Sequence, residues 1–530
     1  MPDSMIDLLD LELAWRRVKL DLPDRVFVRH PYELELIETN LETWLESLRR
    51  KLTDNTYNPE KMLVCDVPKG AGLVRPGGHL TIADRVVYAA CVGASLERIY
   101  DYLSSQDDKI DFSYRLNKKS SAEQNWLRDR FSGWRDFRLR SLERIDAGAE
   151  YVLIADISGC YENIDLNTLI SDLRGWQVPT AVIDLLSKCL NRWAQVPGRG
   201  LPQGHSPSDI LAKLYLSRID MALKDRGYVH CRYVDDYRVF CENELAAKKA
   251  LVEFTGLLRR RGLSVQTHKT AIHSAADARY KIDGVVPTLL KVQRQFIDMV
   301  NELLAEDDPY LTLSEAEQAL AGPGWADPAE APIELLREAY RKHFIEPNDA
   351  FNRTLFRFLL RRLGAQADDF AIGHCLSLLE EHPEETKNIL RYANQAGCAQ
   401  QAQERITAFL NSESAIYPYQ VYEMIEWVGN LSEPPKSDLI AVVRRTGFDP
   451  RQPAYVRAVC RKVLAEHGTQ ADLDRLESQY AESYSALEQS EIICAIRQME
   501  RVRRNAFIAR AEGDGDMQRR AARLIKQRDH

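Results

Sequence analysis

Hydrophobic positions along the chain change their spacing twice. Over residues 5–50 they recur every three to four positions, as in IDLLDLELAW and ELELIETNLETWLESL, which predicts helices. Over residues 57–290, short apolar runs alternate with Gly/Pro turns and helical segments, a texture typical of an α+β unit. After that, almost every apolar position follows helical spacing. The pattern predicts an N-terminal helical extension over residues 1–56, an α+β domain over residues 57–290 and an all-α domain over residues 291–530.

The C-terminal part is predicted to be a succession of short amphipathic helices. Phe351, Leu355, Phe358 and Leu359, for example, would share one helical face. Helix-breaking residues recur along this part, at Gly364, Pro383, Gly397, Pro418, Pro434, Gly447 and Gly468. The succession is typical of a helical-repeat solenoid of the HEAT-like kind, and a single irregular helical domain explains the same pattern.

Composition indicates a folded protein of the reducing cytoplasm. The 530 residues are 45% hydrophobic and 28% charged, and no two of the ten cysteines form a CxxC pair, which argues against zinc ribbons and secreted disulfide frameworks. The first residues, MPDSMIDLLD, lack the basic and apolar regions of a signal peptide. The uncharged apolar stretch at residues 86–96 is too short to cross a bilayer. We therefore expect a cytoplasmic protein without a membrane partner.

A net charge of −8 would ordinarily count against a nucleic-acid partner. Basic and acidic residues are equal in number over residues 1–290, so the whole excess of acid lies in the helical part. Within residues 51–290 there are 34 basic and 30 acidic residues. A local basic channel is therefore compatible with the acidic whole.

Three acidic residues are predicted to meet at the end of one sheet. In CRYVDDYRVFC, residues 231–241, apolar and aromatic runs flank an Asp pair, which predicts a tight hairpin with Asp235 and Asp236 at its tip. An isolated Asp pair is usually a solvated turn, but these flanks are too apolar for an ordinary surface turn. Asp156 ends the apolar run 151–155, where a carboxylate is costly without a cation partner. A divalent metal would keep all three ionised, as two-metal phosphoryl transfer requires.

Several motifs, in family order, resemble those of reverse transcriptases. The palm motifs are LIADISGCYENID around Asp156, LPQGHSPS at 201–208, YVDD at 233–236 and GLSVQTHK at 262–269. PKGAGLVRP at 68–76 resembles a fingers motif of retron and group II intron enzymes, and DFSYRLN at 111–117 resembles their next fingers block. The resemblance spans about residues 60–290. It implies the fingers and palm of a right-hand polymerase that uses two Mg²⁺ ions, for which Mn²⁺ can substitute, and takes dNTPs.

The resemblance also implies roles for the acidic and basic residues of the palm. Asp156 and Asp235 would bind both metal ions, and Asp236 would be the less central third acid. Lys269 matches the position of a proton donor for the departing pyrophosphate, a general-acid role. A helix cap or a surface salt bridge explains Lys269 equally well.

Other matching residues would surround the incoming nucleotide. Tyr161 matches an aromatic steric gate that leaves no room for a 2′-hydroxyl, although a core aromatic residue is the alternative. Lys69 and Arg75 match basic fingers residues that grip the triphosphate, with solvated surface charge as the alternative. Gln203 and Gly204 match the motif that lines the nucleotide and template pocket.

Three residues depart from the pattern of the relatives. Lys213 stands where many of them have Asn, His205 follows Gly204, and Arg238 replaces the usual apolar residue two positions after the Asp pair. Lys213 and His205 affect the expected template contacts and leave the catalytic acids intact.

A nucleic-acid contact is predicted in RDRFSGWRDFRLRSLER, residues 128–144, where aromatic and Arg residues interleave. Guanidinium groups neutralise phosphates and aromatic faces stack on bases. The candidates are Arg128, Arg130, Trp134 and Arg135. An amphipathic helix with an apolar core face explains the same spacing.

The helical part resembles the C-terminal region of abortive-infection and related defence reverse transcriptases of bacteria, some of which make DNA without a template and prime it on a protein hydroxyl. We therefore expect an antiviral enzyme that joins dNTPs into a DNA product by two-metal nucleotidyl transfer, untemplated and protein-primed, and that forms a homo-oligomer. One alternative is a templated reverse transcriptase guided by a bound non-coding RNA. A second is an assembly scaffold with a vestigial palm.

Overall fold

The computed structural model divides the chain into two compact units. It describes residues 5–23, 26–70, 72–117, 125–128, 130–283, 333–346, 351–483 and 485–528. The first unit comprises residues 1–29, 40–65 and 76–284, and the second comprises residues 30–39, 66–75 and 285–530. Each unit therefore combines segments that are distant in sequence. The predicted domain limits at residues 56 and 290 stay predictions, and residue 290 lies outside the described residues.

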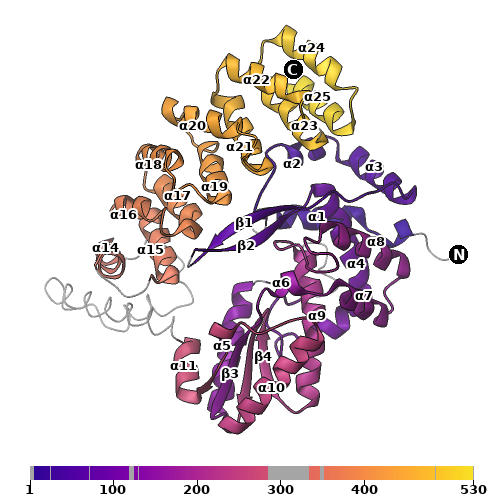
Figure 1. The fold of residues 1–530 in the computed structure, drawn as a ribbon, viewed down its shortest axis with the longest axis vertical. Helices are drawn as coiled ribbons and strands as arrows, with labels where there is room; N and C mark the ends of the chain where they lie inside the picture. Colours follow the sequence, from indigo (N-terminus) through magenta and orange to yellow (C-terminus); the bar gives the residue numbers. More distant parts are fainter. Residues whose placement is uncertain are drawn as a thin grey trace, which may run out of the picture. The chain divides into compact units, whose positions relative to one another are not determined.

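A four-stranded antiparallel sheet forms the centre of the first unit (Figure 1). Its strand order is β4-β5-β3-β6. The strands are β3 (Tyr151–Asp156), β4 (Val229–Tyr233), β5 (Asp236–Cys241) and β6 (Ala271–Ser274). The apolar run of β3 lies between β5 and β6, where its side chains are covered on both faces.

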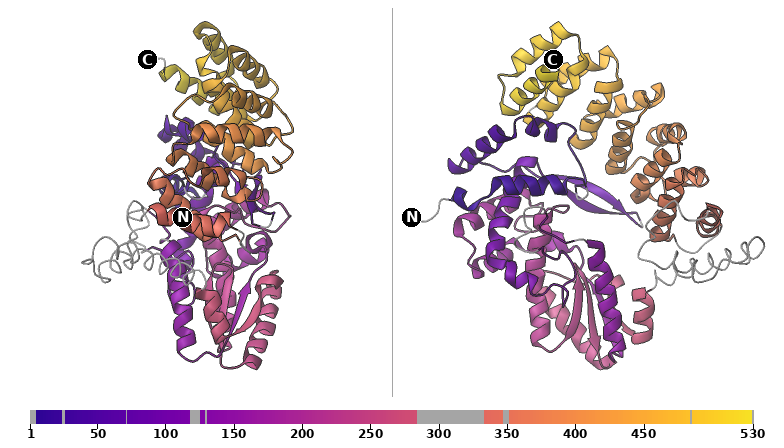
Figure 2. Two further views of the ribbon diagram at one scale, coloured as in Figure 1. Left: turned by 90° about the vertical axis from the view of Figure 1, so that its left-hand side faces the viewer. Right: turned by 180° about the vertical axis from the view of Figure 1, so that it is seen from behind.

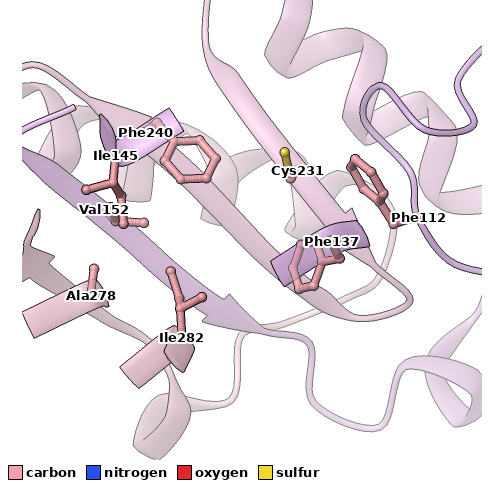
Figure 3. Packing of buried hydrophobic residues seen from close by; sticks show 8 residues of the cluster. All are labelled: Phe112, Phe137, Ile145, Val152, Cys231, Phe240, Ala278 and Ile282. Carbon is pink, nitrogen blue, oxygen red and sulfur yellow. The ribbon is translucent and has the colours of Figure 1, made fainter. Parts of the chain in front are cut away.

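Helices cover the two faces of this sheet. Because side chains alternate along a strand, Val152 and Phe240 point to one face, where they pack with α5 (Arg130–Asp146) and α11 (Ala275–Asp283) in a buried core (Figure 3). Tyr237 points to the opposite face and contacts Phe254, with 4.7 Å between ring centroids. That face is covered by α9 (Ser206–Asp225) and α10 (Glu244–Arg260).

The remaining helices of the first unit are α1 (Leu11–Asp21), α3 (Leu41–Thr53), α4 (Ile82–Ser104), α6 (Cys160–Asn163), α7 (Leu166–Gly175) and α8 (Thr180–Trp193). They pack with one another, and α4 and α7 among them contact α9. Side-chain caps fix several starts, since Thr81 accepts a hydrogen bond from the backbone N–H of Asp84 and Asp165 accepts one from that of Thr168. The helices predicted over residues 5–50 are confirmed.

A two-stranded hairpin, β1 (Leu63–Lys69) and β2 (Leu73–His79), carries the PKGAGLVRP motif. Gly72 has φ +70°, a conformation that favours glycine. Residues 66–75 of the hairpin belong to the second unit, where the Tyr417 hydroxyl lies 3.4 Å from the carbonyl oxygen of Gly72.

The rest of the second unit is helical in its described residues (Figure 2). Its helices are α2 (Glu33–Glu38), α14 (Ile333–Tyr340), α15 (Arg353–Ala365), α16 (Ile372–Ser377), α17 (Thr386–Gln395), α18 (Ala399–Asn411), α19 (Pro418–Val428), α20 (Ser437–Gly447), α21 (Ala454–His467), α22 (Gln470–Tyr480), α23 (Ala486–Ala495), α24 (Arg501–Ala511) and α25 (Asp516–Arg528). Alternate helices pack in a row from α15 through α17, α19, α21 and α23 to α25. An α+β domain followed by a largely helical region is confirmed, and a HEAT-like repeat stays a prediction.

Candidate active site at the end of the central sheet

The acidic turn is a two-residue connection between β4 and β5. Tyr233 pairs with Asp236, which leaves Val234 and Asp235 as the turn. Val234 has φ 55°, a conformation that a β-branched residue rarely adopts, so the turn is strained. The Arg232 guanidinium donates a hydrogen bond to the Val234 carbonyl oxygen at 3.2 Å and so supports this backbone. The tight hairpin predicted from the sequence is present.

A buried ionic network holds the base of this hairpin. Arg232 donates to Asp220 of α9 at 2.9 Å and to Asp111 at 2.5 Å. The Nζ of Lys213 lies 2.7 Å from carboxylate oxygens of both Asp111 and Asp107. Burial alone would raise the pKa of Asp220, but the neighbouring Arg232 and His230 together outweigh burial and lower this pKa to about 2. This network was not predicted from the sequence, in which its one signal is Lys213 at a position where many relatives have Asn.

The three acids lie at one end of the sheet. Asp156 is directly opposite Asp236 in the pairing of β3 with β5, so the two side chains leave the same face. The backbone N–H of Ile157 donates to the carbonyl oxygen of Asp235 at 3.2 Å. Burial, and then the charges of Asp235 and Asp156, raise the pKa of Asp236 to about 7. The structure thus brings together the acids that the sequence singled out.

This set of carboxylates fits magnesium better than a metal that needs a closed cage. Within the described residues, no group of three or more His, Cys, Asp or Glu side chains is placed so that these side chains alone could hold a metal ion. Mg²⁺ is usually bound by one or two carboxylates and keeps its other positions for water and substrate phosphates. After burial, the charges of Asp235 and Asp156 contribute to the raised pKa of Asp236, and a divalent cation would relieve this repulsion.

Lys269 contacts the acidic cluster directly. It ends a short 3-10 helix, Thr267–Lys269, and its Nζ lies 3.2 Å from an oxygen of Asp156 while 65% of its side chain is exposed. The adjoining backbone is tied to the same strand, because the N–H of Gln266 donates to the Asp156 carbonyl oxygen at 2.7 Å. Lys269 therefore forms a salt bridge, which was one of the alternatives to a catalytic role. Its role as a proton donor stays a prediction.

Tyr161 lies in α6, directly after the loop that follows β3. Its hydroxyl donates to Asp209 at 2.6 Å and lies 3.2 Å from the hydroxyl of Tyr114. Its carbonyl oxygen accepts a hydrogen bond from the N–H of Leu201 at 2.9 Å, which joins α6 to the LPQG segment. The ring is fixed at its backbone and at its hydroxyl, a connection that sequence analysis did not find.

The LPQG segment packs against the end of β2. Gly204 has φ +94°, which explains why glycine stands there. Gln203 accepts a backbone hydrogen bond from Gly78 at 3.1 Å, and its side-chain amide lies 3.5 Å from Glu162. The ring of His205 lies 2.9 Å from the Gly78 carbonyl oxygen and is buried, and burial and then Arg85 lower the pKa of this His to about 3. His205 and the buried Lys213 are thus part of the interior.

The predicted triphosphate-binding residues lie on the β1–β2 hairpin. Lys69 is the last residue of β1, Arg75 lies within β2, and both are exposed. Both belong to the second unit, so their grip on a nucleotide stays a prediction.

An aromatic and cationic cluster on α5 adjoins the acidic hairpin. The Trp134 ring is 44% exposed and meets Tyr233 edge to face, with 5.0 Å between centroids. Arg238 lies beneath it, with its guanidinium carbon 3.9 Å from the centroid of Phe137 and a 2.8 Å hydrogen bond to Ser141. The departure at Arg238 is therefore a buried cation that packs against α5.

The other predicted nucleic-acid contacts differ in their surroundings. Arg128 forms ion pairs with Asp107 at 3.2 Å and Asp108 at 2.9 Å, for which a phosphate would have to compete. Arg135 is exposed and pairs with its neighbour Asp136. Arg130 begins α5, and its side chain lies outside the described residues. These three contacts, with that of Trp134, stay predictions where nucleic acid is concerned.

No helix among the residues that the structure describes is long and apolar enough to cross a membrane.

Comparison with known proteins finds curated relatives that match about a third of the chain. Two curated sequences of group II intron-encoded protein LtrA, from Lactococcus lactis subsp. cremoris and its strain MG1363, are each 26% identical over 186 residues. The match covers 34% of this chain and 28% of each relative, so the chain spans little more than a quarter of the length of these relatives.

Among solved structures, similarity is found to telomerase from Candida albicans in complex with a TWJ fragment of telomeric RNA. The TM-score is 0.31 at 11% identity, with 74% of this chain and 68% of that chain covered. Apo telomerase from Candida tropicalis gives a TM-score of 0.30 at 11% identity, with 82% and 68% covered. These scores are too low to establish a shared overall fold.

Residues 67–297 match the family described as reverse transcriptase (RNA-dependent DNA polymerase). The matched residues include the acidic hairpin, the strand that ends in Asp156, the LPQG segment and Lys269. The chain therefore carries a domain of the reverse transcriptase family.

Proposed function

We propose that the chain is a magnesium-dependent DNA polymerase that joins dNTPs, with Asp156, Asp235 and Asp236 as its metal ligands. The observation that carries this proposal is the register of β3 and β5, which sets Asp156 opposite Asp236 and beside the Asp235 turn. Bound Mg²⁺ would supply Lewis-acid stabilisation of the attacking and leaving oxygens. Lys269, beside Asp156, would donate a proton to the departing pyrophosphate.

The residues around the acids would orient the substrates. Trp134 and Tyr233 present an aromatic surface beside the hairpin, suited to stacking on a base of the growing strand. Tyr161 would lie under the sugar and exclude a 2′-hydroxyl. Gln203 and Gly204 would line the nucleotide pocket, with Lys69 and Arg75 on the triphosphate.

We further propose that the activity serves antiviral defence, with synthesis that is untemplated and primed on a protein hydroxyl. The support is the long helical region that follows the reverse transcriptase domain and whose described residues form α14 to α25. We also propose that this region assembles protomers into a homo-oligomer. Its excess of acidic residues disfavours nucleic acid outside a local basic path.

The proposed chemistry is tested by replacing the turn acid. Asp235→Asn keeps the shape of the side chain but removes the charge, so incorporation of dNTPs should fall roughly a thousandfold, because metal stabilisation contributes several kcal/mol. Asp184→Asn, at an exposed position of α8, is the matched control and should retain full activity. An Asp235→Asn protein as active as the wild type would contradict the proposal and favour a scaffold with a vestigial palm.

The guide for synthesis is tested separately. The purified protein is incubated with each dNTP alone, before and after ribonuclease treatment, and the products are sequenced. Synthesis that survives ribonuclease supports the untemplated reading. Ribonuclease-sensitive synthesis of a fixed repeat would favour a bound non-coding RNA as template.

A further inference from the structure

The hydroxyl of Tyr161 is held by two residues from separate segments. It donates to Oδ1 of Asp209 at 2.6 Å, and the hydroxyl oxygens of Tyr161 and Tyr114 are 3.2 Å apart. A hydroxyl has one proton to donate. With that proton on Asp209, the Tyr114 hydroxyl is the donor in the second bond, so Tyr161 is both donor and acceptor.

The two partners are themselves firmly placed. Asp209 lies in the first turn of α9 and is only 6% exposed. Tyr114 follows Ser113, whose N–H and hydroxyl both bond to Asp111 of the buried ionic network. Tyr114 has φ 42°, which is costly for a bulky residue and persists only where the surroundings determine it.

These hydrogen bonds hold the ring of Tyr161, which is expected to exclude a 2′-hydroxyl by its position. Burial, and then the charge of Asp209, raise the pKa of Tyr161 well above its usual value, so the hydroxyl remains a donor at physiological pH. Steric exclusion depends on a few tenths of an ångström, because repulsion rises steeply at contact. A ring free to tilt about its χ angles would therefore discriminate less than a ring tied at its hydroxyl.

We propose that Asp209 and Tyr114 are positioning residues that hold the Tyr161 ring in place and thereby set the preference of the enzyme for deoxyribose over ribose. This inference rests on the proposed polymerase function. It assigns the sugar selectivity to a hydrogen-bonded cluster of three residues on α6, on α9 and in the loop after α4.

The test measures the ratio of kcat/KM for a dNTP to that for the rNTP of the same base, with the full chain and Mg²⁺. Tyr161→Phe and Asp209→Leu each remove the charged hydrogen bond, and each should lower the ratio about tenfold. Tyr114→Phe removes the weaker neutral bond and should lower it about threefold. Asp209→Asn keeps an acceptor oxygen and should restore most of the ratio.

Controls separate positioning from general damage. Tyr100→Phe removes a hydroxyl that donates to the Asn117 carbonyl oxygen at 2.6 Å, so it matches the other Tyr→Phe changes and should leave the ratio unchanged. Thermal unfolding midpoints show which variants fold. If Asp209→Leu does not fold, Tyr161→Phe, which deletes a single oxygen, decides the question.

The outcomes distinguish the inference from the function on which it rests. An active wild type in which Tyr161→Phe and Asp209→Leu keep the full ratio overturns the inference alone. An unchanged ratio in Tyr161→Ala would show that the ring does not select the sugar, which overturns it as well. A wild type that incorporates neither nucleotide contradicts the proposed function, and the inference falls with it.

Discussion

Trp134 is unusual at the scale of the single residue, because a large aromatic ring is left half exposed beside buried acids. The Trp134 ring contacts Tyr233 edge to face, and Tyr233 pairs with Asp236 directly beside the turn that holds Asp235. Part of the ring packs on Phe137 and Tyr233, and stacking on a base would desolvate its open face. A role of Trp134 in binding nucleic acid stays a prediction.

We expect Trp134→Ala to weaken binding of a short single-stranded DNA about tenfold, because stacking contributes roughly 1–3 kcal/mol per base. Trp134→Phe keeps a smaller ring and should lose less. Fluorescence anisotropy of a labelled oligonucleotide measures both. Tyr280→Ala, at a 74% exposed ring on α11, is the control and should bind normally. Equal losses for Trp134→Ala and Tyr280→Ala would contradict a stacking role for Trp134.

At the scale of elements, the Lys213 network joins α9, β4 and the loop after α4. Its charges are taken out of water, and each has an oppositely charged partner within hydrogen-bonding distance. Such a network contributes modestly when intact, but its disruption is costly, because the remaining charge is buried without a partner. The hairpin that carries the acids thus depends on residues outside the recognised motifs.

Lys213→Met should lower the free energy of unfolding by about 3–5 kcal/mol, because it leaves Asp107 and Asp111 buried together with less positive charge. Lys248→Met breaks an exposed pair with Glu244 on α10 and should cost at most about 0.5 kcal/mol. Urea unfolding monitored by circular dichroism compares the two variants. A Lys213→Met protein as stable as the control would show that the network contributes no net stability.

The elements also show where prediction from sequence ends. The hairpin of Asp235 and the strand before Asp156 follow from short apolar runs, and their meeting follows from the cost of unpaired carboxylates and from the resemblance. Asp209 and Lys213 look like ordinary helix positions, because their partners lie in another segment and leave no periodic signal. Residues 30–39 look like part of a local N-terminal extension, yet they pack in the second unit, since the burial of an amphipathic helix does not specify its partner.

At the scale of the whole molecule, the second unit contains a contact between residues that are 461 positions apart. His30 lies 2.5 Å from Glu491 of α23, which also pairs with the buried Arg461 at 2.8 Å. Burial opposes protonation of the His30 ring, but the charge of Glu491 and its hydrogen bond, with the charge of Glu33, together outweigh burial and raise the pKa of this His above its usual value. Charge on His30 therefore stabilises the folded second unit.

The direction of the pH effect follows from linkage. A His whose pKa is raised on folding contributes its full stability below the unfolded value of about 6.5, and the contribution is lost as pH rises through the folded value. We expect the unfolding midpoint to fall between pH 6 and pH 9 in the wild type, and to fall less in His30→Gln. His374→Gln is the control, since burial lowers the pKa of His374 and its effect lies below pH 6.5. Equal slopes in wild type and His30→Gln would contradict the assignment.

The pairing of His30 with Glu491 also determines how late in biosynthesis this contact can form. The two residues are 461 positions apart, so at 5–20 residues per second a ribosome needs roughly half a minute to a minute and a half between them. During that interval α2 has been made but lacks its helical neighbours, and its apolar face is open to chaperones and to other nascent chains. We therefore expect the yield of native protein to depend on translation speed. We also expect fragments that separate residues 30–39 from residues 285–530 of the second unit to aggregate.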